Sequence, residues 1–331
     1  MIEEDIRPKE LMKQKESFLR DDIDFLLARK DRWLNVDCPA CQSGESSLFG
    51  EKHGFTFREC VGCFSVFTSP RPNSDLLGEF YNSSANYRFW NDHIFPATEE
   101  VRKNQIFKPR VEKVIDELEN MGFENYALLE VGAAYGWFCE ILQDSGKASR
   151  VIAVEPGESL ARTCVAKGIE TINLPIEDVS MSESVDVVAA FEVIEHLFSP
   201  ESFVRDMSRL LRPGGAIFMS CPSLYGFDAS LLGTESSVFQ HEHLNYFHPQ
   251  SMRKLLERCG FDSIVVSTPG ELDVNIVDVF LQENEEALER NEFVRNILRN
   301  GSDELKRDLQ SFLAKHGLSS HMWVSARKLA T

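Results

Sequence analysis

The sequence predicts an α/β protein in which a doubly wound, Rossmann-like sheet of seven mostly parallel strands follows a small N-terminal ribbon. From residue 126 onward, short apolar runs alternate with segments of helical spacing, which is typical of a parallel sheet with crossover helices. Residues 128–138 run from an apolar stretch through two glycines into a helical segment. Two Cys-x-x-Cys pairs precede these features, between residues 38 and 63.

Composition limits the function classes. With 331 residues, of which 43% are hydrophobic and 27% charged, the chain can bury a large core. The net charge of −18 and the lack of a dense basic cluster argue against a nucleic-acid substrate. No uncharged apolar run is long enough to span a membrane. The acidic start, Met1 to Asp5, has no apolar leader segment, so we expect a cytoplasmic location.

We expect four segments along the chain. A helical arm over 1–35, loosely packed or mobile, offers no catalytic residues. A metal-binding module covers 36–72, and a helical cap with a linker helix covers 73–125. The α/β domain covers 126–331 and contains a helical insertion at 282–316.

Periodicity places the elements of the α/β domain. Strands are expected at 127–131, 151–154, 185–190, 216–221, 263–267 and 322–326. The last of these is expected to be buried and antiparallel at the edge of the sheet. Helices are expected at 99–119, 137–145, 159–167, 199–211 and 249–259.

The paired cysteines predict a structural zinc site. Cys38 and Cys41 are separated from Cys60 and Cys63 by eighteen residues, a spacing typical of four-thiolate zinc. Alternating residues around the second pair fit the hairpin of a zinc ribbon. A redox dithiol or a disulfide pair is the alternative, and the expected cytoplasmic location favours metal. Four thiolates fill the coordination shell, which favours a structural role over a catalytic one.

The aromatic segment 74–100 allows two interpretations. It can be a helical cap with an apolar face. Alternatively it is a lid over a substrate pocket, to which Tyr87, Arg88, Trp90 and His93 present polar tips.

Acidic residues follow the predicted strands of the α/β domain. Gly132 and Gly136 form the turn after the first strand, where backbone can approach a ligand closely. Glu155 ends the second strand about twenty residues later, the position from which an acid can accept hydrogen bonds from ribose hydroxyls. The alternative for Glu155 alone is a solvated strand end.

Two further acidic groups continue the series. Glu177 and Asp178 follow the apolar residues 174–176 and are placed to meet an adenine edge. Glu192 and His196 follow the strand at 185–190, and they share a face if that segment is helical.

In this order the residues resemble the motifs of class I S-adenosylmethionine-dependent methyltransferases. The matching motifs are Glu130-x-Gly132-x-x-x-Gly136, Glu155-Pro156, Glu177-Asp178, Phe191-Glu192 through His196, and Leu211 through Gly215. Ala134 stands where that family usually has a middle glycine. The resemblance implies that S-adenosylmethionine is bound by Glu130, Gly132, Ala134, Gly136, Glu155, Pro156, Glu177, Asp178, Phe191 and Glu192.

A nicotinamide enzyme fits the turn less well. A dinucleotide needs room for a pyrophosphate, usually over Gly-x-Gly-x-x-Gly at a helix N-terminus. Here the spacing is Gly-x-x-x-Gly, with Glu130 just before it. The resemblance implies that this region receives the amino-acid end of the cofactor, whose ammonium suits a carboxylate.

The zinc module followed by residues 240–247 is similar to methyltransferases that act on nucleotide-linked sugars and surface polysaccharides. In the sugar C-methyltransferases of that group a Glu-His pair faces the acceptor, and Glu242 and His243 match it. Tyr246 is expected to contact the substrate. Both O- and C-methylation stay open, because those C-methyltransferases carry an additional C-terminal domain that this sequence does not include.

Methyl transfer to a hydroxyl or an acidic C–H requires a base. His243 is the first candidate, with Glu242 orienting it, and His241 and His196 are the others. The alternative for each histidine is a purely structural bond to loop backbone.

We therefore expect S-adenosylmethionine-dependent methylation of a small hydroxylated acceptor, a sugar or nucleotide-sugar of surface-polysaccharide or secondary metabolism. Two alternatives remain: a non-catalytic cofactor-binding or scaffold protein, and a methyltransferase that acts on a protein or tRNA. The oligomeric state cannot be read from the sequence.

Overall fold

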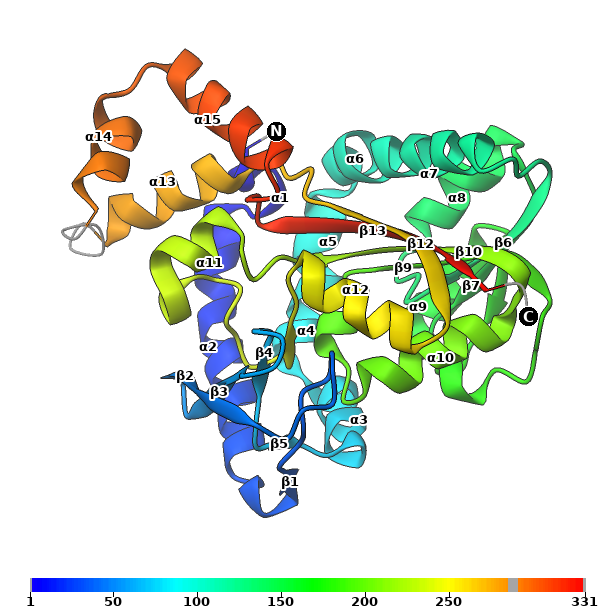
Figure 1. Ribbon diagram of the computed structural model, residues 1–331, viewed down its shortest axis with the longest axis horizontal. Helices are drawn as coiled ribbons and strands as arrows, with labels where there is room; N and C mark the ends of the chain where they lie inside the picture. Colours follow the sequence, from blue (N-terminus) through cyan, green and yellow to red (C-terminus); the bar gives the residue numbers. More distant parts are fainter. Residues whose placement is uncertain (1, 285–290, 330–331) are drawn as a thin grey trace.

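The central element of the computed structural model, which describes residues 2–284 and 291–329, is a seven-stranded sheet in the order β8-β7-β6-β9-β10-β13-β12 (Figure 1). Its strands are β6 (Tyr126–Val131), β7 (Ala148–Val154), β8 (Glu170–Ile172), β9 (Val185–Phe191), β10 (Leu211–Pro222), β12 (Phe261–Ser267) and β13 (His321–Lys328). The five strands from β8 to β10 pair in parallel. The doubly wound fold class is confirmed.

The sheet corrects one predicted position. β13 is antiparallel and buried as expected, but it pairs with β10 on one side and β12 on the other. The prediction that it lies at the sheet edge was wrong, because β12 takes that place. The seventh strand, β8, escaped the strand assignment because its three residues are too few to show alternation.

Helices cover both faces of the sheet (Figure 1). The core on one face is formed with α7 (Lys108–Asn120), α8 (Trp137–Ser145) and α9 (Glu158–Ala166). The core on the other face is formed with α10 (Pro200–Leu210) and α12 (Pro249–Arg258). Helices α8, α9, α10 and α12 lie within two residues of the expected ends. The order of the strands reverses between β6 and β9, and the carboxyl ends of strands at such a switch point form the usual ligand crevice of this architecture.

The N-terminal region packs more firmly than expected. Helix α1 (Glu3–Ile6) is followed by α2 (Lys9–Leu27), in which Asp22, Ile23 and Leu26 are buried. α2 contacts the cap helices α3 (Ser74–Ser83) and α4 (Ala85–Phe89). The expected loose arm is therefore an integral layer against the cap, because its apolar stripe joins the same core as the cap.

The cap continues as one helical run with two π-helical turns. The segments are η2 (Trp90–Ile94), α5 (Phe95–Ala97), α6 (Glu99–Arg102) and η3 (Lys103–Phe107), followed by α7. The helix expected at 99–119 thus comprises α6, η3 and α7.

The cysteine-bearing module contains η1 (Lys30–Arg32), a short pair of β1 (Trp33–Leu34) with β5 (Arg71–Pro72), and a second sheet in the order β11-β4-β3-β2. That sheet is made of β2 (Ser46–Lys52), β3 (Phe55–Cys60), β4 (Val66–Thr68) and β11 (Asn245–Tyr246). β11 comes from a distant part of the chain, after β10. The ribbon is therefore completed by the segment that carries the candidate histidines.

The remaining elements all come from the second half of the chain. They are η4 (Ile176–Asp178), η5 (Ile194–His196), α11 (Phe227–Leu232), η6 (Gly233–Glu235), α13 (Asp273–Glu283), α14 (Glu292–Asn300) and α15 (Asp303–Lys315). The helical insertion expected at 282–316 begins earlier, at Asp273, and its residues 285–290 lie outside the described part. Of the helices within residues 2–284 and 291–329, none combines the length and apolar character needed to cross a bilayer.

Candidate functional site

The turn between β6 and α8 has a backbone that only small residues tolerate. Gly132 and Gly136 adopt φ values of 73° and 67°. A Cβ atom on Gly132 would lie 2.8 Å from Val193 Cγ2, and one on Gly136 would lie 2.8 Å from Ile169 Cδ1. These close approaches require glycine at both positions and shape a cradle at the sheet's switch point.

Glu155 lies at the end of β7, beside this turn. Its buried carboxylate accepts hydrogen bonds from the backbone N–H groups of Ala134 and Gly157, each at 2.8 Å. Burial raises the pKa of Glu155, and the two N–H donors oppose that rise. Each carboxylate oxygen retains a lone pair, since ionised carboxylates offer about four acceptor sites. The geometry therefore leaves Glu155 able to accept bonds from ribose hydroxyls, and Ala134 helps to hold it.

Two residues next to Glu155 complete the cofactor side. Pro156 is exposed, and the Asn173 amide donates to the carbonyls of Glu155 and Pro156 at 2.8 and 3.0 Å. Glu177 and Asp178 lie exposed in η4 after β8, as the adenine-side position would require. Asn173 was missed by sequence reasoning.

Glu130 lies inside the cradle with only 3% of its surface exposed. The Cys139 thiol donates to its carboxylate at 3.1 Å. Burial raises the pKa of Glu130 to about 8, although Arg110 lowers it in part. A cation arriving beside Glu130 would favour its ionised form.

Arg110 is a site residue that the sequence did not reveal. Its guanidinium lies 4.5 Å from the centre of the Phe191 ring and 3.9 Å from the Glu192 carboxylate. It sits on α7, where the amphipathic pattern predicted only packing. The Arg110 guanidinium, over the Phe191 ring at the end of β9, places a positive charge beside the carboxylates of Glu130 and Glu192.

Glu192 and His196 have separate partners. Glu192, with a φ of 56°, accepts from Ser220 Oγ at 2.6 Å and lies 2.8 Å from His321 Nε2. His196 ends the short turn η5 and contacts the Tyr81 hydroxyl and the Glu242 carbonyl instead. His321, on β13, was also missed, because only tertiary structure brings it to this strand end.

The cap packs against the turn between β6 and α8. The Tyr135 hydroxyl donates to the Asn91 carbonyl of η2, and Trp137 Nε1 donates to the Glu99 carboxylate at 3.0 Å. The Tyr135 and Trp137 rings are stacked 4.9 Å apart, with Phe95 against both. The segment 85–107 is thereby fixed directly to the turn that would hold the cofactor.

His196 lies between the cap and the segment 240–243. Its Nδ1 is 3.1 Å from the Glu242 carbonyl and 3.2 Å from the Tyr81 hydroxyl. Because a carbonyl can only accept, Nδ1 carries the proton. Within the described residues Nε2 makes no hydrogen bond, and it lies 3.8 Å from Glu195 Oε1. Burial lowers the pKa of His196 to about 4, so the ring is neutral near pH 7. Its side chain is 24% exposed.

His243 is held by two bonds. Its Nδ1 lies 2.8 Å from the Val238 carbonyl, and its Nε2 lies 3.1 Å from Gln240 Nε2. Burial lowers the pKa of His243 to about 3. The Glu242 carboxylate, expected to orient this ring, instead accepts from the Asn86 amide at 2.7 Å. His241 is buried beside Glu242, with 3.4 Å between its Nε2 and Glu242 Oε1.

The expected substrate residues are dispersed. Tyr87 is half-buried, and its ring lies 6.0 Å from that of Tyr81. Arg88 and His93 are exposed, and Trp90 lies under the Lys15 ammonium. Tyr246 is buried in the ribbon and donates to the His243 carbonyl at 2.7 Å. Only Tyr87 thus joins Tyr81 and His196, and Tyr81 was missed.

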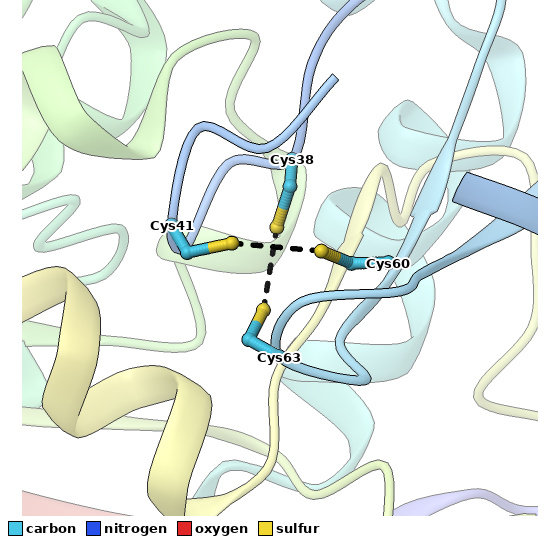
Figure 2. A group of neighbouring side chains, drawn as sticks. All are labelled: Cys38, Cys41, Cys60 and Cys63. Atoms are coloured by element: carbon cyan, nitrogen blue, oxygen red, sulfur yellow. Dashed lines mark hydrogen bonds between the residues drawn. The ribbon is translucent and has the colours of Figure 1, made fainter. Parts of the chain in front are cut away.

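The four thiols of the ribbon converge on one point, as Figure 2 shows. The sulfurs of Cys38 and Cys63 are 3.4 Å apart, those of Cys41 and Cys60 are 3.5 Å apart, and all four lie within 4.8 Å of one another. Sulfurs around a tetrahedral zinc ion, with Zn–S near 2.3 Å, are about 3.8 Å apart. All four cysteines are free thiols, so the donor set fits zinc.

Comparisons with known proteins agree with this geometry. Residues 102–266 match a family model described as a methyltransferase domain. A protein of Mycolicibacterium smegmatis named as a probable S-adenosylmethionine-dependent methyltransferase is 32% identical over 143 residues, which are 41% of this chain and 51% of that protein. A ubiquinone biosynthesis O-methyltransferase of Idiomarina loihiensis is 26% identical over 47% of this chain and 63% of its own length.

Among solved structures, an S-adenosylmethionine-dependent methyltransferase of Mesorhizobium loti superposes with a TM-score of 0.45 and 14% identity, over 68% of this chain and all of that chain. The curated relatives are thus matched over only about half to two thirds of their length. The matched residues run from the end of α6 to β12 and include β11, but they exclude β2, β3 and β4 of the ribbon and most of the cap.

Proposed function

Because residues 102–266 carry a class I S-adenosylmethionine-dependent methyltransferase domain, we propose that this chain transfers a methyl group to a small hydroxylated acceptor, a sugar or nucleotide-sugar. When bound, S-adenosylmethionine supplies an electrophilic methyl group on a sulfonium centre. The residues of the chain then hold the cofactor, orient the acceptor and remove its proton.

The cofactor side is assigned to the cradle and the strand ends. Glu155 accepts hydrogen bonds from the ribose hydroxyls of the cofactor. Glu177 and Asp178 contact its adenine edge, and Glu130 and Glu192 lie at its amino-acid end. Arg110 adds a cation there, suited to a carboxylate. This assignment extends the motif resemblance with the contacts described above.

We base the choice of acceptor on one observation: the side chains that lie between the cap and the ribbon are polar. Tyr81, Asn86, Tyr87, His196 and Glu242 come from α3, α4, η5 and the segment 240–243, and all are at least partly buried. Burial, with smaller contributions that include Glu155, raises the pKa of Tyr87 to about 12, so its phenol stays a hydrogen-bond donor. Buried donors and acceptors in this number suit a hydroxylated acceptor better than an apolar one.

For the base we favour His196 over His243, which was the first candidate on sequence grounds. His196 presents a free Nε2 lone pair, whereas both ring nitrogens of His243 already have partners. Its Nδ1–H is fixed by the Glu242 carbonyl, which sets the tautomer. Nε2 of His196 would take the proton of the acceptor hydroxyl as its oxygen bonds to the methyl carbon and the bond from that carbon to the cofactor sulfur breaks, which would leave S-adenosylhomocysteine. The same base would serve an acidic C–H.

The proposal is tested by following label from methyl-labelled S-adenosylmethionine into a panel of nucleotide-sugars, free sugars and catechol-type phenols. We expect label in a nucleotide-sugar or sugar fraction. Label found only in the phenols, or only in RNA or protein when these are supplied in parallel reactions, would contradict the acceptor class. Binding of S-adenosylhomocysteine without transfer to any acceptor would favour a non-catalytic cofactor-binding protein.

A histidine variant tests the assignment of the base. His196→Asn should lower turnover at least about 100-fold, the usual contribution of a positioned base, while S-adenosylhomocysteine affinity stays unchanged. His93→Asn, an exposed histidine on the cap, is the matched control and should retain activity. Full turnover in His196→Asn would contradict this assignment and would make His243 the first candidate for the base.

A further inference from the structure

A second cluster of metal-ligating side chains lies apart from the cysteines. Asp22 of α2 meets His241 and Glu242, and one ligand atom from each lies within 4.8 Å of the others. His241 Nε2 is 3.4 Å from Glu242 Oε1 and 4.0 Å from Asp22 Oδ2. The side chains are 0%, 13% and 5% exposed for His241, Glu242 and Asp22. Two carboxylates and one imidazole therefore share a water-poor space.

His241 lacks hydrogen-bond partners there. Within the described residues, neither of its ring nitrogens makes a hydrogen bond, and both atoms are buried. Leaving a buried polar group unsatisfied costs about 1–3 kcal/mol, so an imidazole in this state points to a missing partner. The Asn86 amide oxygen is likewise buried and unpartnered.

The two carboxylates are fixed in place by one segment of the cap. Asp22 accepts from the Ser84 hydroxyl and from the Ala85 N–H at 3.0 Å. Glu242 accepts from the Asn86 amide at 2.7 Å. Such outer bonds are what orients carboxylates in metal sites. Three consecutive residues at the start of α4 thus hold both acids toward His241.

The negative charge of Asp22 and Glu242 is not balanced by a nearby lysine or arginine in the described residues. In the residues that the structure describes, no lysine or arginine nitrogen lies within 4.0 Å of either carboxylate, and His241 is their single ion-pair partner. Lys15 acts on Glu242 and His241 only from a greater distance. Buried carboxylates are normally paired or bound to metal.

We propose that Asp22, His241 and Glu242 bind a divalent cation. Ligand atoms around an ion at about 2.1 Å lie about 3.0–3.4 Å apart, so the observed spacing needs only a small contraction around the ion. Two carboxylate oxygens and one imidazole nitrogen form a harder ligand set than the four thiolates of the cysteine site. A set of this kind favours ions such as Mn²⁺. The cation joins α2 and α4 to the segment 240–243, and it does not depend on methyl transfer.

The experiment uses the full chain with its cysteine site saturated with zinc. Mn²⁺ is titrated alone, and electron paramagnetic resonance measures free and bound ion. We expect one Mn²⁺ per chain, with a nitrogen coupling from a single imidazole in the bound spectrum. Asp22→Asn and His241→Ala should each weaken Mn²⁺ binding at least about tenfold, since even outer-shell losses cost that much.

Asp21→Asn is the matched control, because Asp21 is the exposed neighbour of Asp22. The Mn²⁺ affinity of this variant should equal that of the wild type. The nitrogen coupling in the wild-type protein tests the site even if a variant fails to fold. Absence of stoichiometric Mn²⁺ binding, bound Mn²⁺ without nitrogen coupling, or equal affinity in folded Asp22→Asn would each overturn the proposal.

Discussion

The Glu155 carboxylate holds two neighbouring backbone segments in place. It fixes the cofactor turn by accepting the N–H of Ala134, and it fixes the start of α9 by accepting the N–H of Gly157. Its remaining lone pairs are free for ribose hydroxyls. Removing the side chain therefore loses the ribose bonds and also loosens the turn.

We expect Glu155→Ala to weaken S-adenosylhomocysteine binding by about 1–3 kcal/mol, the value of charge-assisted hydrogen bonds. Isothermal titration calorimetry measures the change. Glu158→Ala, an exposed acid paired with Arg162 on α9, is the control and should bind normally. Equal affinity in Glu155→Ala and the wild type would remove Glu155 from the cofactor site.

Glu130 gives a prediction on pH. Its pKa of about 8 in the fold lies above its ordinary value of 4.5, so the folded state favours the neutral acid. That stabilisation is full below pH 4.5 and is lost as pH rises toward 8, with a slope of at most about 1.4 kcal/mol per pH unit. In cofactor-free protein, the unfolding free energy of Glu130→Gln relative to wild type should therefore increase from pH 5 to pH 8 in urea titrations. A difference that is constant with pH would mean that Glu130 is ionised in the fold.

At the residue scale, the sequence located the acids at the strand ends but not the partners that decide their roles. Glu155 could be placed because position along β7 determines which edge of the sheet it reaches. The bonds of His243 to Val238 and Gln240 could not be predicted in the same way, because they depend on how the loop folds back. Arg110 and His321 reach Glu192 from elements far away in the chain.

At the element scale, the ribbon and the acceptor segment form one unit. β11 pairs with β4, and His248 Nε2 lies 2.7 Å from the Cys63 carbonyl. The convergence of the four thiols could be predicted from cysteine spacing, because the ligand spacing of a zinc ribbon is a local sequence pattern. The joining of β11, and the place of β13 between β10 and β12, depend on nonlocal pairing that no local pattern reveals.

Removal of zinc should therefore impair the acceptor side more than the cofactor side. Structural zinc contributes about 10 kcal/mol or more to folding of small modules, so chelation should loosen β2–β4 and β11. We expect lost turnover with retained S-adenosylhomocysteine affinity, and recovery when zinc is added back. Zinc content is measured by atomic emission. Full turnover in zinc-free protein would separate the ribbon from the acceptor site.

At the scale of the whole molecule, three regions outside the matched domain converge on one edge of the sheet. The arm contributes Asp22 and the cap contributes Tyr81 and Asn86 around His196 and the segment 240–243, and Thr68 of the ribbon donates to the His243 carbonyl at 3.4 Å. The doubly wound sheet was predictable because apolar runs and glycine turns are local signals. The role of the arm was not, because Asp22 resembles any surface acid until α2 is packed against α4.

The central claim is that the cradle at Glu130 to Gly136 holds S-adenosylmethionine. Calorimetry of the intact chain with S-adenosylhomocysteine, and separately with NADH, tests it most directly. We expect one S-adenosylhomocysteine bound per chain and no heat of binding from NADH. Binding of NADH without binding of S-adenosylhomocysteine would contradict it.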